Sequence, residues 1–182
     1  GVRIPPSDWT GAGMRGTDTR TVTFDGAACE VVGRSGWYLE RPGFWHGAVG
    51  VAASWWGGAL GLLASMRSRV DPDEPHALAL LGEAEAVAFA AGAVLQRAAS
   101  DIDRTPHDQR AAHVRALRTR RGVADSCLRI IALANEALGP RALAFDPEHA
   151  RRVADLEVYV RQDHGRRDSE VLGRLVLTEG DG

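Results

Sequence analysis

The spacing of apolar and polar residues changes near Phe44 and divides the chain into two parts. Before this point the chain is rich in Gly, Thr and Pro. The β-branched run over residues 19–24, closed by the turn pair Asp25-Gly26, predicts a strand. A second short strand is expected over residues 29–32. Because two strands are not stable alone, residues 1–43 need a further sheet or a helix to pack against.

From Phe44 onward apolar residues recur at helical spacing, and pairs that contain proline interrupt the pattern. Helices are expected over residues 45–69, 75–103, 106–138, 146–160 and 167–177. In the third, steps of three, four and seven predict one buried stripe of Leu117, Ala124, Leu128, Ile131 and Leu138. In the fourth, Asp146 suits the N-cap and Pro147 the first turn. The pattern predicts a mainly α fold: an antiparallel four-helix bundle over residues 44–182, preceded by a short β-hairpin within residues 1–43.

Residues 47–66 contain no charged side chain and are long enough to cross a membrane. The alternative is a central bundle helix that the other helices cover. The many Gly and Ala residues of this stretch add little hydrophobicity. Trp55 and Trp56 lie near its middle, whereas membrane helices carry such residues at their ends. We therefore expect a buried core helix and no membrane span.

Composition excludes some classes of partner and indicates a compartment. The 182 residues are 45% hydrophobic and 25% charged, as in an ordinary globular protein, and the net charge of -2 argues against general nucleic-acid binding. Cys29 and Cys127 fit neither a metal motif nor a disulfide framework, so a cytoplasmic location is expected. The chain opens on Gly1, not Met, and on a turn-like segment, so we expect its start to be a truncation.

The segment before the first helix resembles a known pair of strands. Its residues Gly13-Met14-Arg15-Gly16-Thr17-Asp18-Thr19-Arg20, followed by Val22-Thr23-Phe24-Asp25-Gly26, are similar to the G-x-R-G-S/T-D-S/T-x-x-L/V-x-F-D/E pattern that ends the middle β-domain of acyl-CoA dehydrogenases. Helices in the order of that family's C-terminal domain follow. The resemblance implies that residues 1–43 are a remnant of the middle β-domain. Residues 44–182 would be the C-terminal helical bundle of a divergent branch, present as a fragment.

Two positions match, in part, residues with which that family binds its flavin, and a third is expected near the flavin ring. Arg67 lies where an R-x-x-F-G motif supplies an Arg to the flavin pyrophosphate of a neighbouring subunit, although the Phe and Gly are absent. Gly139 lies where a Gly-Gly turn touches the flavin of the partner chain, and only one Gly remains. Gln162, in the last joint between helices, is expected beside the isoalloxazine. The resemblance thus implies FAD as cofactor and a homodimer or homotetramer, because each site is built from two chains.

The last joint also contains the candidate base. In the family, a Glu eight residues after the Asp of an R-D pair removes a proton α to the thioester carbonyl. Here Asp155 stands at the Asp position, and the count reaches Asp163. A carboxylate can act as this base when burial raises its pKa, and the imidazole of the neighbouring His164 is an equal candidate, because histidine changes charge near neutral pH. The alternative is a solvated cap, since Asp-His-Gly often ends a helix.

The resemblance implies an FAD-dependent enzyme that dehydrogenates an acyl-CoA or a related thioester across its α,β bond and passes electrons to an electron-transfer acceptor. Two alternatives stay open. A flavin-dependent monooxygenase of the same fold lacks the Glu base and often has a His in this joint, where His164 stands here. A non-catalytic helical oligomerisation module would explain the lost Phe-Gly, the lost second Gly and the absent E-G-T of the catalytic joint.

Two further groups of residues have both a structural and a functional interpretation. Aromatic rings and an imidazole crowd the start of the first helix: Trp37, Tyr38, Phe44, Trp45 and His46. Packing between the two parts of the chain is favoured over stacking on a flavin or an acyl group. The third helix carries a basic stretch of Arg110, Arg115, Arg118, Arg120 and Arg121. A solvated face is favoured, with binding to the phosphates of coenzyme A or to another anionic partner as the alternative. No spacing of a metal-binding pair is found in the sequence.

Overall fold

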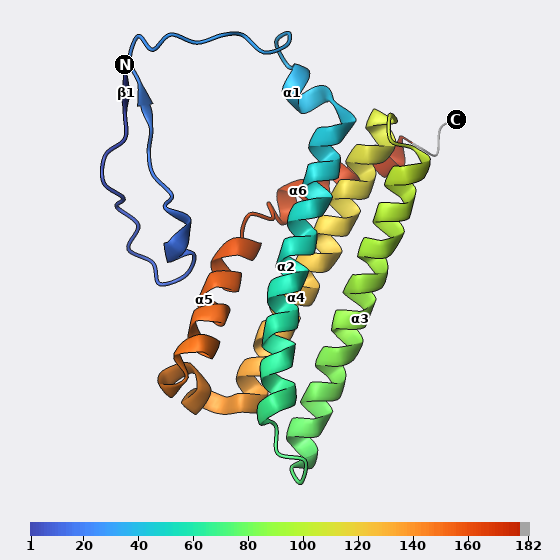
Figure 1. The fold of residues 1–182 in the computed structure, drawn as a ribbon. Coiled ribbons are helices and arrows are strands. Elements are labelled where there is room, and N and C mark those ends of the chain that lie inside the picture. The colour runs from blue at the N-terminus through green and yellow to red at the C-terminus, as the bar shows by residue number, and fades with distance from the viewer. Residues whose placement is uncertain (179–182) are drawn as a thin grey trace.

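The structure is a computed structural model that describes residues 1–178, and it consists of a bundle of long helices with an extended N-terminal arm (Figure 1). Its elements are β1 (Val2–Arg3), a 3-10 turn (Arg15–Thr17), β2 (Thr23–Phe24), α1 (Trp37–Glu40), α2 (Pro42–Arg69), α3 (Pro75–Arg104), α4 (Gln109–Phe145), α5 (Pro147–Val160) and α6 (Arg166–Leu177). The arm comprises residues 1–36, which precede the first helix.

The bundle forms around α2 and α4, with α3 on one side and α5 on the other (Figure 1). The turn between α2 and α3 and the joint between α4 and α5 lie at its lower end, whereas α1, α6 and the turn between α3 and α4 lie at its upper end. The largest fully buried side chains include Trp55, Leu62, Met66, Ile130 and Leu133. This arrangement confirms the predicted mainly α fold, an antiparallel four-helix bundle preceded by a short antiparallel strand pair.

The start of α5 follows the capping residues that the sequence predicts. Asp146 Oδ1 accepts hydrogen bonds from the backbone amides of Glu148 and His149, both at 3.1 Å. Pro147 occupies the first turn, where a missing amide donor is harmless. Local sequence therefore predicts this helix start, and an ion pair between Asp146 and Arg69 of α2 adds a tertiary contact to it.

The end of α4 contains the predicted break and a helical extension that was not predicted. The helix was expected to stop before Gly139-Pro140, and Gly139 does break it, with a φ of 66° and a ψ of −179°. Helical turns then resume and continue to Phe145. The Gly-Pro pair therefore ends the regular helix after Leu138, as predicted, and Pro140 fits the first turn of a short helical segment that was not predicted.

The strands of the arm pair differently from the prediction. β2 lies antiparallel to β1, with Val2 opposite Phe24 and Arg3 opposite Thr23. The strand predicted over residues 29–32 is wrong, because β2 bonds instead to the first residues of the chain and this segment is left exposed, without strand structure. A local pattern shows that a segment can form a strand, but not which segment it pairs with.

The arm lies against α5 at a position that requires glycine. The backbone amide of Met14 donates to Asp155 Oδ1 at 2.6 Å. Next to it Gly13 is buried, and a Cβ atom there would overlap the carbonyl oxygen of Ala154. Only glycine therefore lets the backbone of the arm approach α5 this closely. The predicted division of the chain at residue 43 lies near the start of α2 and stays a prediction.

Two helices, α2 and α3, are long and apolar enough to cross a membrane, by length and composition alone. The sequence singles out only the first of them. In the bundle α2 packs against α3, α4 and α5, and its residues Trp55, Leu62 and Met66 are buried. This central position is the one that the core-helix interpretation expects, and the absence of a membrane span stays a prediction.

Candidate functional site

A cleft of about 460 Å³ opens at the upper end of the bundle, where α1, α2, α4 and α6 meet. The residues that line it include Tyr38, Phe44, Trp45, Leu117, Arg120, His164 and Asp168. We call it the His164 cleft. It brings the aromatic residues around the start of α2 together with the joint between α5 and α6, although these segments are far apart in the sequence.

Aromatic rings form one wall of the His164 cleft. Phe44 packs edge-on against Tyr38 and Trp45, with ring centroids 5.7 and 5.1 Å apart. Trp45 also stacks on His113 of α4 at 3.8 Å. Burial lowers the pKa of His113, against the opposing effect of the Asp168 carboxylate. The buried Trp45 Nε1 has no hydrogen-bond partner within residues 1–178. These aromatic residues therefore both pack between elements and line a cavity.

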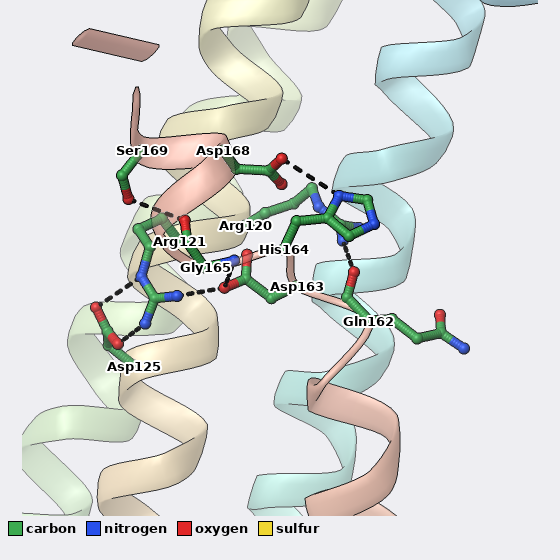
Figure 2. A network of polar contacts seen from close by, with 9 residues as sticks. All are labelled: Arg120, Arg121, Asp125, Gln162, Asp163, His164, Gly165, Asp168 and Ser169. Carbon is green, nitrogen blue, oxygen red and sulfur yellow. Dashed lines mark hydrogen bonds and ion pairs between the residues drawn. The ribbon is translucent and has the colours of Figure 1, made fainter. Parts of the chain in front are cut away.

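The joint between α5 and α6 supplies an imidazole and a carboxylate to the cleft. Figure 2 shows His164 turned toward Asp168, which lies in the first turn of α6, with His164 Nδ1 3.3 Å from Asp168 Oδ1. The His164 side chain is 67% exposed and the Asp168 side chain 15%. An aspartate that accepts from Nδ1 fixes the proton there. Nε2 of His164, which has no hydrogen-bond partner in the described part of the chain, is then free to exchange a proton with a bound molecule.

Asp163 points away from the cleft into a closed junction (Figure 2). Its carboxylate forms an ion pair with Arg121 and accepts a hydrogen bond from the Gly165 amide at 3.2 Å. Arg121 also pairs with Asp125, one turn along α4. The Asp163 side chain is only 4% exposed. We call Arg121, Asp125, Asp163 and Gly165 the Arg121 junction. It holds the joint against α4, and the expected use of Asp163 as a base stays a prediction that this geometry does not favour.

The side chain of Arg120 binds the backbone of the same joint. Its Nη2 donates to the carbonyl oxygen of Gln162 at 2.7 Å, and its guanidinium lies 4.6 Å from the ring centroid of Trp55. The side chain of Gln162 is exposed and extends away from Asp163 (Figure 2). The backbone of Gln162 therefore has a structural role, and the expected contact of this residue with a flavin ring stays a prediction.

Arg67 and Gly139 lie far from the His164 cleft, at the lower end of the bundle. Arg67 is exposed near the end of α2 and pairs with Glu85 of α3, and Gly139 forms the kink in α4. The rise of α2 between Phe44 and Arg67 corresponds to roughly 35 Å. One chain therefore does not bring these residues to the cleft. Contact of Arg67 and Gly139 with the flavin of a neighbouring chain, as the resemblance implies, stays a prediction.

Sequence reasoning missed Asp168, and it assigned Arg120 and Arg121 to a solvated face, although Arg120 is buried. One signal was present, because His164 and Asp168 are four residues apart, and side chains at this spacing are neighbours on a helix. The roles of the two arginines carry no such signal. Each contacts the α5–α6 joint across 42 positions of sequence.

No protein-family model matches the chain, and no curated protein matches its sequence. Among solved structures it resembles dibenzothiophene monooxygenase (TdsC) from Paenibacillus sp. A11-2, with a TM-score of 0.71 and 22% identity. It also resembles FMN-bound TdsC, with a TM-score of 0.72 and 21% identity, and the complex of TdsC with FMN and indole, with 0.72 and 22%. Each match covers 98% of this chain and 53% of the other, so the chain spans about half the length of these neighbours. At this identity the likeness shows the fold, the one implied by the resemblance to acyl-CoA dehydrogenases.

Proposed function

We propose that the chain forms the proton-transfer side of a flavin-dependent monooxygenase whose substrate is an aromatic compound. The observation that carries the proposal is the position of His164. Its imidazole faces an aromatic cleft and is held by Asp168, whereas the Asp163 carboxylate is engaged by Arg121. The neighbouring structures support this choice, because TdsC is named a monooxygenase and one structure contains both FMN and indole.

The His164 cleft fits part of a flavin ring system. Phe44 and Trp45 offer flat apolar surfaces, and the buried Trp45 Nε1 is a donor without a partner within residues 1–178. Flavin rings carry nitrogen and oxygen atoms that can accept from such a donor. Arg41, which also lines the cleft, adds a positive charge. We favour FMN over the FAD that the resemblance implies, since the neighbours hold FMN. When bound, reduced flavin supplies two electrons for the activation of dioxygen.

Proton transfer is the part of the reaction that this chain's own residues would perform. In a monooxygenation one oxygen atom enters the substrate and the other leaves as water, which requires a proton. With Nδ1 bonded to Asp168, Nε2 of His164 accepts a proton when the imidazole is neutral and donates it when protonated. The aromatic wall beside this nitrogen offers a stacking surface to a fused-ring substrate.

Dehydrogenation of an acyl thioester has less support. It needs a free base beside the α-carbon, but Asp163 is closed in by Arg121, and Asp168 already binds His164. A purely structural module would not need an imidazole in an aromatic cleft. The cytoplasmic location, the electron-transfer acceptor and the homodimer or homotetramer expected from the sequence stay predictions.

The proposal is tested with the polypeptide as its gene encodes it, reduced FMN from a separate flavin reductase, isotope-labelled dioxygen and indole. We expect labelled oxygen in a hydroxylated product, measured by mass spectrometry. The His164→Ala variant should form this product about 100-fold more slowly, a usual loss for a proton-transfer residue. FMN binding, measured by quenching of tryptophan fluorescence, should persist in the His164→Ala variant. Most of this quenching should be absent in Trp45→Phe, which removes the tryptophan of the cleft.

The matched control is His76→Ala, which removes an exposed histidine of α3 that lies outside the cleft and should leave the rate unchanged. Bleaching of the flavin by an acyl-CoA, without dioxygen or reductase, would establish dehydrogenation instead and overturn the proposal. A full rate in His164→Ala would remove His164 from the proposed role.

A further inference from the structure

Residues of α3, of α4 and of the turn that joins these helices line a second hollow. This turn lies at the upper end of the bundle (Figure 1). The hollow has a volume of about 700 Å³, and we call it the α3–α4 groove. Helix α4 separates it from the His164 cleft: Leu117 and Arg120 line the cleft, whereas Arg115 and Arg118 line the groove. The apolar residues of the groove include Val94, Ala98 and Val114.

One arginine of the groove is buried without a counter-charge. The Arg115 residue is 8% exposed, and its Nη2 donates to the Thr105 hydroxyl at 2.7 Å. Its Nη1 is buried and has no hydrogen-bond partner within residues 1–178, and no carboxylate in that range pairs with it. Burial, and after it the charge of Arg115, lowers the pKa of His46. A buried guanidinium without an acidic partner is unfavourable, so this position calls for an anion.

The other charges of the groove do not supply that anion. Asp101 is the carboxylate that lines it, and Asp101 already pairs with Arg97 and Arg104. Arg118 is exposed on the same face of α4 as Arg115 and has no ion-pair partner in the described part of the chain. The groove therefore presents four guanidiniums and one carboxylate around an apolar floor.

We propose that the α3–α4 groove binds an amphiphilic oxyanion. Its phosphate or carboxylate group would lie at Arg115 and Arg118, and a short apolar body would lie against Val94 and Val114. Such an oxyanion supplies both the missing acceptor for Arg115 Nη1 and its missing counter-charge. The apolar floor gives the body of the ligand a surface to cover. This site does not depend on flavin chemistry, because it lies across α4 from the His164 cleft.

The test is isothermal titration calorimetry at constant ionic strength, on the polypeptide as its gene encodes it, with inorganic phosphate, octyl phosphate and octanoate as probes. We expect saturable binding, with octyl phosphate or octanoate at least about 10-fold tighter than inorganic phosphate because of the apolar floor. The tighter of these two identifies the ligand as a phosphate ester or a carboxylate. Val94→Ser should weaken the binding of octyl phosphate and of octanoate and leave the binding of inorganic phosphate unchanged.

Variants of the two arginines test the anion contact. Arg118→Gln, at an exposed position, should weaken octyl phosphate by about 10-fold. Arg115→Lys keeps the buried charge but removes the forked donor, and should weaken it similarly. The matched control is Arg151→Gln, which removes an exposed arginine of α5 that has no ion-pair partner within residues 1–178. It should leave binding unchanged.

Three results would overturn the proposal. The first is a lack of saturable binding by all three probes. The second is equal weakening by Arg118→Gln and Arg151→Gln, which would indicate general attraction between charges. The third is a loss of molecular mass in Arg118→Gln, measured by light scattering, with no effect of any anion. That result would make the groove an interface between copies of the chain.

Discussion

The two sides of the joint between α5 and α6 differ in how their charged groups are satisfied. On one side the Arg121 junction engages Asp163 in an ion pair and a backbone hydrogen bond, in a nearly buried position. On the other, the His164 cleft holds an exposed imidazole with one ring nitrogen unpartnered in the described part of the chain. Residues adjacent in the sequence thus have different tasks. Asp163 holds the joint against α4, and His164, the next residue, faces the cleft.

The largest effect is expected from the closed side. Asp163→Ala should lower the free energy of unfolding by about 2–3 kcal/mol, because it leaves Arg121 and the Gly165 amide without their buried partner. The matched control is Asp125→Ala, which removes the 63% exposed partner of the same guanidinium and should cost about 0.5 kcal/mol or less. Chemical denaturation followed by circular dichroism measures both. Equal losses would show that the two sides of the junction do not differ.

A smaller effect, confined to activity, is expected on the open side. If Asp168 orients His164, Asp168→Asn should lower kcat about 10-fold and leave KM and the free energy of unfolding nearly unchanged. Asp168→Glu, which keeps the carboxylate, should recover part of the rate, and Asp125→Asn should have no effect on it. Product formation with indole provides the measurement. A raised KM at full kcat would mean that Asp168 shapes the cleft without acting through His164.

The smallest effect concerns acid and the wall of the cleft. Burial lowers the pKa of His113 from its ordinary value of 6.5, so the folded chain binds fewer protons there than the unfolded chain. The folded state therefore keeps its full stability with respect to His113 above about pH 6.5. Below this pH the free energy of unfolding falls, by at most about 1.4 kcal/mol per pH unit. His113→Gln should reduce the loss of stability between about pH 7.5 and about pH 5.5 in denaturation experiments. Part of the loss of stability should remain in this variant, because the pKa values of His46 and His149 are also lowered. An unchanged loss in the variant would contradict this account.

The fold was predictable because local signals agree with the tertiary structure. Asp146 and Pro147 determine where α5 begins, and the apolar stripe of α4 places Leu117, Ala124 and Ile131 in the interior. The errors arose where a distant partner decides. The strand predicted over residues 29–32 failed because β2 pairs with the first residues of the chain. The helix expected to end at Leu138 does break at Gly139, but the short helical segment that follows was not predicted.

The candidate site was less predictable for the same reason. Counting eight residues from Asp155 gives Asp163 and its neighbour His164 equal standing as a base. Arg121, on another helix, takes Asp163 out of the cleft, and no pattern near residue 163 shows this. The aromatic residues around the start of α2 were expected to pack between elements. Trp45 does stack on His113, yet it lines the cleft as well. Function here depends on pairings between helices, which spacing along one helix does not reveal.

The contact of Gly13 with α5 has a mechanical consequence. The arm packs against α5 there because Gly13 has no side chain. A single methyl group at this position would push the backbones of the arm and of α5 apart. The amide of Met14 and the carboxylate of Asp155 would be driven apart together with them. Because α5 leads directly into the joint that carries His164, a side chain at position 13 that displaces α5 would also change the orientation of the imidazole.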